Sequence, residues 1–296
     1  METNLSATDQ TIKRFIERFQ RNEITEYFVY RRLAAMTTGK NQETLLRIAD
    51  DEQRHHRAWK KYTNNDVPPS RPLIGLYTTL AKVFGLTFAI RLMEKGEERA
   101  QRGYEQVLKT FPETQAIFAD EHRHEFELID IIREAKITYI GSIVLGLNDA
   151  LVELTGALAG LSFALRDTKT VALAGLVTGL AASMSMAGSE YLSQKTEVQT
   201  DNRHPLRAAI YTGLAYVATV LLLILPFLLA KDYKVALAAS LLIALLIIIA
   251  FTFFTSIVKN VSFKKKFIEM ATISFSVSFI SFAIGTVLRT VFNIDT

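Results

Sequence analysis

Two Glu-x-x-His patterns occur in the first half of the chain. One comprises Glu52 and His55, and the other comprises Glu121 and His124. Residues three apart on a helix share one face, so each pair can direct a carboxylate and an imidazole at the same point. Imidazole and carboxylate are ligands for iron and manganese. One such pair usually lies on a solvated face, but two of them predict a metal site.

The helices that would position these pairs are expected near residues 9–37, 42–63, 86–110 and 113–137. Their apolar periodicity predicts a four-helix bundle, and each helix also carries acid within its apolar stripe. A buried carboxylate is strongly unfavourable unless it is neutralised, and two metal ions would neutralise this set. The expected metal ligands are Glu23, Glu52, His55, Glu94, Glu97, Glu121 and His124.

Glutamate from each of two helices, with Glu-x-x-His from each of two others, is the ligand pattern of ferritin-like di-iron and di-manganese sites. Over residues 9–137 the chain resembles the rubrerythrin-type, ferritin-like di-iron proteins. The resemblance implies an iron cofactor, with manganese as the alternative, and implies that Glu52 and Glu121 bridge the ions. Cysteine is absent, which excludes disulfides, thiolate ligands and the four-cysteine electron-transfer module of rubrerythrins proper.

Composition divides the 296 residues into two parts. Residues 1–136 are rich in charged side chains, whereas residues 137–296 are largely apolar, which predicts a soluble domain followed by a membrane domain. The net charge is +4, but the basic residues lie beside apolar segments rather than on one stripe, which argues against nucleic-acid binding. The first forty residues contain no apolar core of a signal peptide, so we expect the first domain in the cytoplasm.

Five apolar segments are long enough to cross a bilayer, which requires about 20 helical residues. We expect them at 139–165, 170–193, 206–230, 233–258 and 267–292. Lysine and arginine are more frequent in the connections on the side of the N-terminal domain. This bias places the N-terminus inside and the C-terminus outside a multi-pass, all-α protein.

The first two segments contain polar residues that a passive anchor does not need. These are Asn148, Asp149, Glu153, Met186 and Glu190. A charge at the centre of a span costs roughly 2.5 to 3.5 kcal/mol, so such residues usually face a pathway or a partner. The alternative is that Glu190 lies at the inner interface and Asp149 bonds a neighbouring helix. The last three segments are expected to be scaffold.

The stretch from Gly146 to Ala150, together with that from Ser185 to Tyr191, resembles the vacuolar iron transporter family over residues 137–296. The resemblance implies a five-span homodimer that exchanges Fe²⁺ for protons, with Asp149 and Met186 on the path. Thioether sulfur favours transition metals over Mg²⁺ and Ca²⁺. The chain departs from the family pattern at Ala150, where glycine is usual, and at Glu153, where a small polar residue is common.

Two further segments bear on how the four-helix bundle is related to the membrane domain. Residues 73–92 are apolar but interrupted by Lys82 and Arg91, so we expect them to lie on the membrane surface or cover the bundle rather than cross. No helix breaker stands between Pro112 and Gly141, so the fourth helix is expected to continue into the first span.

The whole arrangement resembles the membrane-bound ferritins of prokaryotes, and we expect the protein in the cell membrane. The principal hypothesis is capture of cytoplasmic Fe²⁺ by the bundle and export through the first two spans in exchange for protons. A second hypothesis is a membrane-anchored di-iron oxidase, acting as a ferroxidase or peroxide scavenger. A third is a tethered, non-catalytic iron-storage or regulatory domain.

Overall fold

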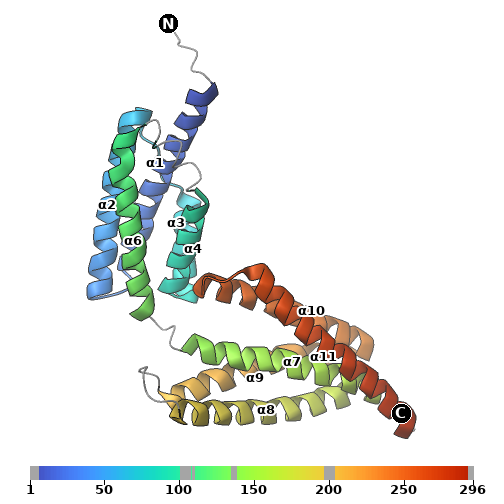
Figure 1. The fold of residues 1–296 in the computed structure, drawn as a ribbon. Coiled ribbons are helices and arrows are strands. Elements are labelled where there is room, and N and C mark those ends of the chain that lie inside the picture. Colours follow the sequence, from blue (N-terminus) through green and yellow to red (C-terminus); the bar gives the residue numbers. More distant parts are fainter. Residues whose placement is uncertain (1–6, 101–107, 109–110, 135–138, 197–203, 293–296) are drawn as a thin grey trace. The chain divides into compact units, whose positions relative to one another are not determined.

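The computed structural model describes residues 7–100, 108, 111–134, 139–196 and 204–292. Every regular element among these residues is a helix, which confirms the all-α prediction (Figure 1). The chain separates into two compact units, Met1–Ala135 and Lys136–Thr296. The residues between the last helix of the first unit and the first helix of the second, where the sequence predicts a continuous helix, lie partly outside the described residues.

The first unit is a closed bundle. Helices α1 (Ala7–Ala34) and α2 (Lys40–Thr63) are joined by a turn in which Gly39 takes a left-handed φ of 67°. The chain continues through α3 (Arg71–Phe84), α4 (Leu86–Ala100), the 3-10 turn η2 (Pro112–Thr114) and α6 (Gln115–Glu134). Helix α1 packs against α2 and α3, α3 against α4, and α6 against both α4 and α2.

One helix of this bundle, α3, was not among the four expected from the sequence. Residues 73–92 had been interpreted as one apolar segment, but Gly85 divides them. At φ 95° Gly85 adopts a conformation that a side chain disfavours, and it ends α3 immediately before α4 begins. Neither α3 nor α4 is among the helices long and apolar enough to span a membrane.

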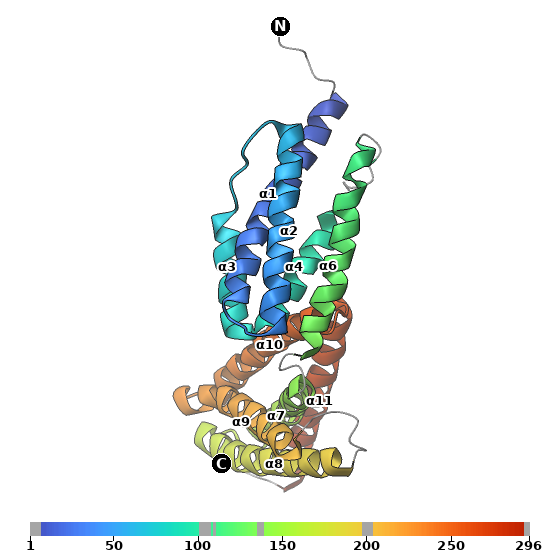
Figure 2. The same ribbon diagram turned by 90° about the vertical axis from the view of Figure 1, so that its left-hand side faces the viewer.

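The second unit consists of five long helices. They are α7 (Ile140–Leu165), α8 (Thr168–Thr196), α9 (Pro205–Leu229), α10 (Tyr233–Val258) and α11 (Phe263–Phe292). These are the five helices, among the residues the structure describes, that are long and apolar enough to cross a bilayer, as the sequence predicted. Helix α7 packs against each of the other four, so it forms the centre of the unit (Figure 2).

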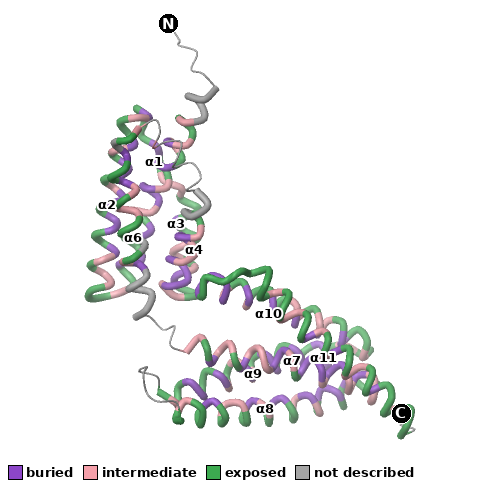
Figure 3. The backbone as a smooth tube through the Cα atoms, in the orientation of Figure 1, coloured by how far each residue is buried: buried purple, intermediate pink, exposed green. Residues whose placement is uncertain are grey.

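Burial follows a different pattern in the two units (Figure 3). In the first unit the buried residues face the bundle interior, with a core around Phe19, Trp59 and Ile117. In the second unit large apolar side chains also cover the outer surface, for example Leu229 at 75% and Phe279 at 70% exposure. An apolar outer surface on helices of this length suits a hydrocarbon environment.

Close approach of the membrane helices depends on glycine. A Cβ at Gly156 would lie 2.8 Å from the Val277 side chain, and one at Gly160 would lie 3.0 Å from the Ser281 backbone oxygen. A Cβ at Gly285 would collide with the backbone oxygen of Gly160. Helices α7 and α11 therefore pack backbone to backbone, as small residues permit in membranes.

We expect Gly285→Ala to destabilise the second unit, because the obstructing atom is backbone and cannot rotate away. Overpacking of this kind costs about 1–3 kcal/mol. Thermal unfolding of the purified protein in detergent would measure the loss.

The matched control is Gly188→Ala on α8, where a new Cβ meets nothing within 4 Å. Alanine has the higher helix propensity, so this control should unfold at the same temperature or higher. Equal unfolding temperatures for both variants would contradict the close packing of α7 on α11.

Candidate metal centre

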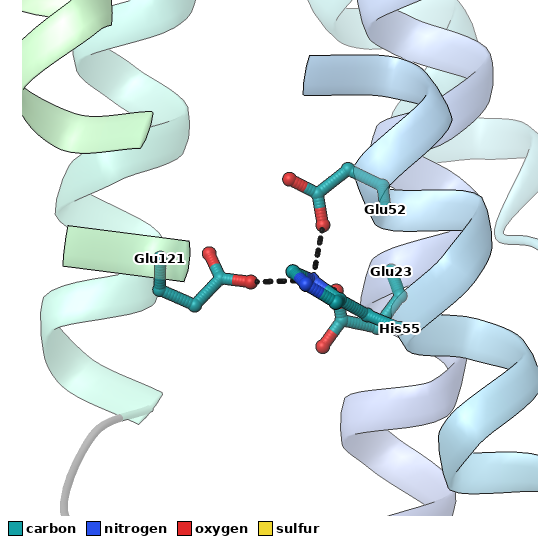
Figure 4. Close-up of side chains that lie close together, drawn as sticks. All are labelled: Glu23, Glu52, His55 and Glu121. Carbon is teal, nitrogen blue, oxygen red and sulfur yellow. Dashed lines mark ion pairs between the residues drawn. The ribbon is translucent and has the colours of Figure 1, made fainter. Parts of the chain in front are cut away.

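Four side chains from three helices converge in the core of the first unit (Figure 4). Glu23 comes from α1, Glu52 and His55 from α2, and Glu121 from α6, and their ligand atoms lie within 4.8 Å of one another. The Nδ1 atom of His55 is 3.0 Å from a Glu121 oxygen and 3.5 Å from one oxygen each of Glu23 and Glu52. These four are among the seven ligands expected from the sequence.

Glu52 lies between two imidazoles. Its Oε1 atom is 3.1 Å from Nδ1 of His124, and its Oε2 atom is 3.5 Å from Nδ1 of His55. The two histidine rings are stacked, with centroids 5.8 Å apart and planes inclined by 28°. Helices α2 and α6 thus each present a Glu-x-x-His pair to the same space.

The polar atoms of this cluster test whether a metal fits. Four buried atoms of this cluster have no hydrogen-bond partner among the described residues: Glu52 Oε2, His55 Nδ1, Glu121 Oε1 and His124 Nδ1. The short contacts between them lack hydrogen-bond geometry, and buried polar atoms without partners are costly and uncommon. A transition-metal ion accepts lone pairs from both carboxylate oxygen and imidazole nitrogen. The residues therefore fit a metal site.

Two aspartates orient the histidines from behind. His55 donates through Nε2 to Asp120 at 3.3 Å, and His124 donates through Nε2 to Asp51 at 3.0 Å. This arrangement keeps Nδ1 of each ring free of a proton when a metal binds it, and it raises the basicity of the imidazole. Each aspartate comes from the helix opposite its histidine, so the two contacts also join α2 to α6.

Two arginines complete the arrangement. Arg54 contacts Asp51 at 2.7 Å and Asp120 at 2.6 Å, and Arg123 contacts the same two carboxylates at 3.0 Å each. Sequence analysis missed all four residues. The signal was present, because Asp-Glu-x-Arg-His occurs twice, at 51–55 and at 120–124. We had interpreted only its Glu-x-x-His part.

Trp59 holds the ligand from α1. Its Nε1 atom donates to Glu23 Oε1 at 2.9 Å, and the indole is completely buried. The other oxygen of Glu23 faces His55. Because Trp59 is the only tryptophan of the chain, its fluorescence reports on this site alone.

The structure does not bring every predicted ligand into the cluster. Glu94 on α4 is buried, but its Oε2 atom lies 3.1 Å from Arg91 and it is not among the four converging residues. The side chain of Glu97 lies outside the described residues. Their assignment as ligands stays a prediction.

Without metal, the cluster shares protons. Burial raises the pKa of Glu23 to about 7, and burial together with the charge of Glu23 raises that of Glu121. For His55 and His124 burial alone would lower the pKa, but the surrounding carboxylates outweigh it and raise both values, that of His124 to about 9. A metal ion must therefore displace protons from the site.

These shifts set the pH dependence of stability. A pKa raised on folding contributes stability that is present below the unfolded value and is lost as pH rises through the folded value. Glu23 loses its contribution as pH rises from its ordinary pKa of 4.5 through about 7, and His124 loses its contribution as pH rises from its ordinary pKa of 6.5 through about 9. We expect the metal-free first unit to unfold at lower temperature as pH rises over this window, followed by Trp59 fluorescence.

Bound metal should reverse this trend, because fewer protons compete for the ligands at higher pH. Thermal unfolding with Mn²⁺ under anaerobic conditions, compared with a chelator, would show a gain in unfolding temperature that grows with pH. In the Glu23→Gln variant without metal, the unfolding temperature should fall less steeply with rising pH than it does in the unmodified protein. A metal-induced gain that shrinks with pH would contradict the assignment.

Removing the charge behind a histidine should weaken metal binding. We expect Asp51→Asn and Asp120→Asn each to lower the affinity for Fe²⁺ or Mn²⁺ by about 10–100-fold, the usual effect of losing such a partner. Anaerobic metal titration of the full-length protein, followed by Trp59 fluorescence, would measure this.

The control for this titration is Glu43→Gln, which changes an exposed carboxylate in the first turn of the same helix, α2. It should bind metal with unchanged affinity. If both aspartate variants also bind like the unmodified protein, the two aspartates do not orient the ligands.

The second unit holds the polar residues expected in the membrane. Asp149 and Glu153 lie one turn apart on α7, and Glu153 accepts a hydrogen bond from the hydroxyl of Tyr216 at 2.8 Å. Tyr216, on α9, is fully buried. The sequence predicts scaffold for α9, because this segment contains almost no charge within the span.

Glu190 and Met186 follow on α8. Glu190 is 7% exposed and accepts a hydrogen bond from Ser142 of α7 at 2.7 Å, and the backbone oxygen of Ser142 in turn accepts from Thr212 of α9 at 2.9 Å. Met186 is partly buried against the core of the unit. Glu190 therefore links α8 to α7, and Ser142 links α7 to α9.

Part of the second unit is similar to a known protein family. Residues 140–204 match the model of the VIT family. The match covers α7, α8 and the connection after them, and thus includes Asp149, Met186 and Glu190. No curated protein matches the chain.

Proposed function

We propose that this protein transports Fe²⁺ across a membrane, with Mn²⁺ as the closest substitute, and that its first unit is a ferritin-like metal-binding domain. One observation carries the proposal. A buried carboxylate and histidine cluster with orphaned ligand atoms lies in the same chain as a five-helix unit whose first two helices match the VIT family. Both parts offer ligands suited to the same class of ion.

The first unit is proposed to hold two ions. Glu52 faces a histidine with each of its oxygens, and each histidine has its own aspartate behind it. Two equivalent half-sites that share Glu52 explain this symmetry, with Glu121 as the second bridging ligand. A bound metal pair would supply positive charge that neutralises the buried carboxylates, and in the presence of oxygen it could also exchange electrons.

Transport is assigned to the polar residues of α7 and α8. The VIT match agrees with the resemblance to vacuolar iron transporters seen in Asp149 and Met186. A carboxylate binds either a metal ion or a proton, so Asp149 and Glu153 would release one as they bind the other. We propose export from the cytoplasm in exchange for protons, with Glu190 at the inner end of the path.

Topology and assembly complete the proposal. Basic residues at the connections that follow α8 and α10, such as Lys195, Arg207 and Lys264, favour a cytoplasmic location for these connections and for the first unit. Glu153 is exposed in a single chain although it lies midway along α7. A charge facing hydrocarbon costs roughly 2.5 to 3.5 kcal/mol. A homodimer that covers this part of α7 would remove that cost.

Metal flux in proteoliposomes tests the function. We expect Asp149→Asn to reduce Fe²⁺ flux at least about tenfold, which corresponds to about 1.4 kcal/mol, because an amide cannot alternate between metal and proton. Uptake would be followed with a trapped fluorescent chelator, and proton movement with a trapped pH dye.

The control is Glu269→Gln, which changes an exposed carboxylate of α11 that pairs with Lys266. Its flux should equal that of the unmodified protein. Unchanged flux in Asp149→Asn would sink the transport assignment. Oxygen consumption that depends on Fe²⁺ and Glu52, without any flux, would instead support the membrane-anchored oxidase.

A further inference from the structure

Helix α3 of the first unit carries an apolar stripe on its outer surface. Its members are spaced as one helix face and are Leu73, Leu76, Leu80, Val83 and Phe84. Val83 is 67% exposed, Leu76 and Phe84 are each 49% exposed, and Leu73 is 39% exposed. Leu80 is half-buried.

This stripe is additional to the face that α3 buries in the bundle. Ile74 and Ala81 point into the core and are 5% and 6% exposed. A surface helix of a soluble bundle normally has one apolar face towards the core and polar residues opposite it. Contiguous apolar residues outside the face that packs on the core indicate a surface that contacts something else.

The charges of α3 indicate what that contact is. The helix contains Arg71 and Lys82 and no acidic residue. Helical periodicity places both basic residues on the side away from the α3 apolar stripe. An apolar stripe with a basic opposite side is typical of helices that lie in the interface of an anionic membrane, where lysine and arginine are attracted to the headgroups.

The five apolar helices of the second unit place the chain in a membrane. Helix α6 ends at Glu134, and the first membrane helix begins at Ile140. Glu134 and Ile140 are six residues apart along the chain, so their Cα atoms are separated by at most about 22 Å. Within the first unit, α3 and α6 finish at the same end of the bundle, as both ribbon views show (Figures 1 and 2). Helix α3 therefore ends on the side of the first unit from which the chain continues towards the membrane helices.

We propose that α3 docks through its apolar stripe onto the anionic surface of the bilayer that the second unit spans. The docked helix holds the metal-binding bundle at the membrane, with Val83 and Phe84 inserted below the headgroups. This inference depends on the five apolar helices and not on the transported ion.

The absence of cysteine allows a direct test in the full-length protein. Leu76→Cys and Val83→Cys, each labelled with an environment-sensitive fluorophore, would be reconstituted in nanodiscs containing phosphatidylglycerol, with and without brominated acyl chains. We expect brominated lipid to quench both labels by about twofold or more, Val83 most strongly. Both side chains are largely exposed, so their replacement leaves the bundle core intact.

Lys61→Cys is the matched control. Lys61 is an exposed residue near the C-terminal end of α2, and this end of the bundle is the one opposite the end at which α3 finishes. Its label should not be quenched. The charge contribution is tested by Arg71→Gln with Lys82→Gln in the Val83→Cys background, where quenching in phosphatidylglycerol should fall towards the level in phosphatidylcholine. Quenching at Leu76 and Val83 no greater than at Lys61 would overturn the proposal.

Two other occupants have their own signatures. If a second copy of the chain covers the stripe, Leu76→Cys will form an intermolecular disulfide and brominated lipid will not quench its label. If another part of the same chain covers it, the labels will report an apolar environment with neither quenching nor cross-linking. Either result overturns docking on lipid. Neither affects the Fe²⁺ flux assay, so failure here is distinguishable from failure of the transport proposal.

Discussion

Burial of Glu52 is the constraint on which the first unit depends. A carboxylate that is 1% exposed needs a positive partner, and Glu52 faces two imidazoles. Those imidazoles are held by Asp51 and Asp120, whose own charges are matched by Arg54 and Arg123. The charges therefore alternate in sign from the core to the surface. A metal ion would complete this alternation at its centre, where several ligand atoms lack hydrogen-bond partners.

Carboxylates of the second unit also need partners, but there the partners are hydroxyl groups instead of imidazoles. Water and mobile ions are absent from a bilayer core, so Glu153 and Glu190 must find partners on neighbouring helices. Tyr216 and Ser142 donate to them. Hydroxyl donors stabilise a carboxylate without neutralising it, so its charge remains available to a cation. The first unit gathers histidine and carboxylate ligands at one point, whereas the described carboxylates of the second unit are paired with single hydroxyl donors on neighbouring helices.

Apolar surface has separate roles along the chain. In the second unit it covers helices that glycine brings into close contact, such as Gly160 and Gly285. On α3 apolar surface appears on a helix too short to cross a bilayer, in addition to the face already buried in the bundle. Hydropathy alone does not separate these cases. The deciding quantities are helix length and the position of Gly85, which ends α3 before it could extend into α4.

The sequence by itself determined the all-α fold, the five apolar helices and the placement of each Glu-x-x-His pair on one face of its helix, because helix periodicity and span length are local properties. Only the tertiary structure decided that Asp51 bonds His124 and that Asp120 bonds His55. Those contacts depend on how neighbouring helices are rotated against one another. Spacing within one helix shows which residues share a face of that helix. It does not show how the helix is rotated against its neighbours, and the rotation decides which residue of the next helix becomes the partner.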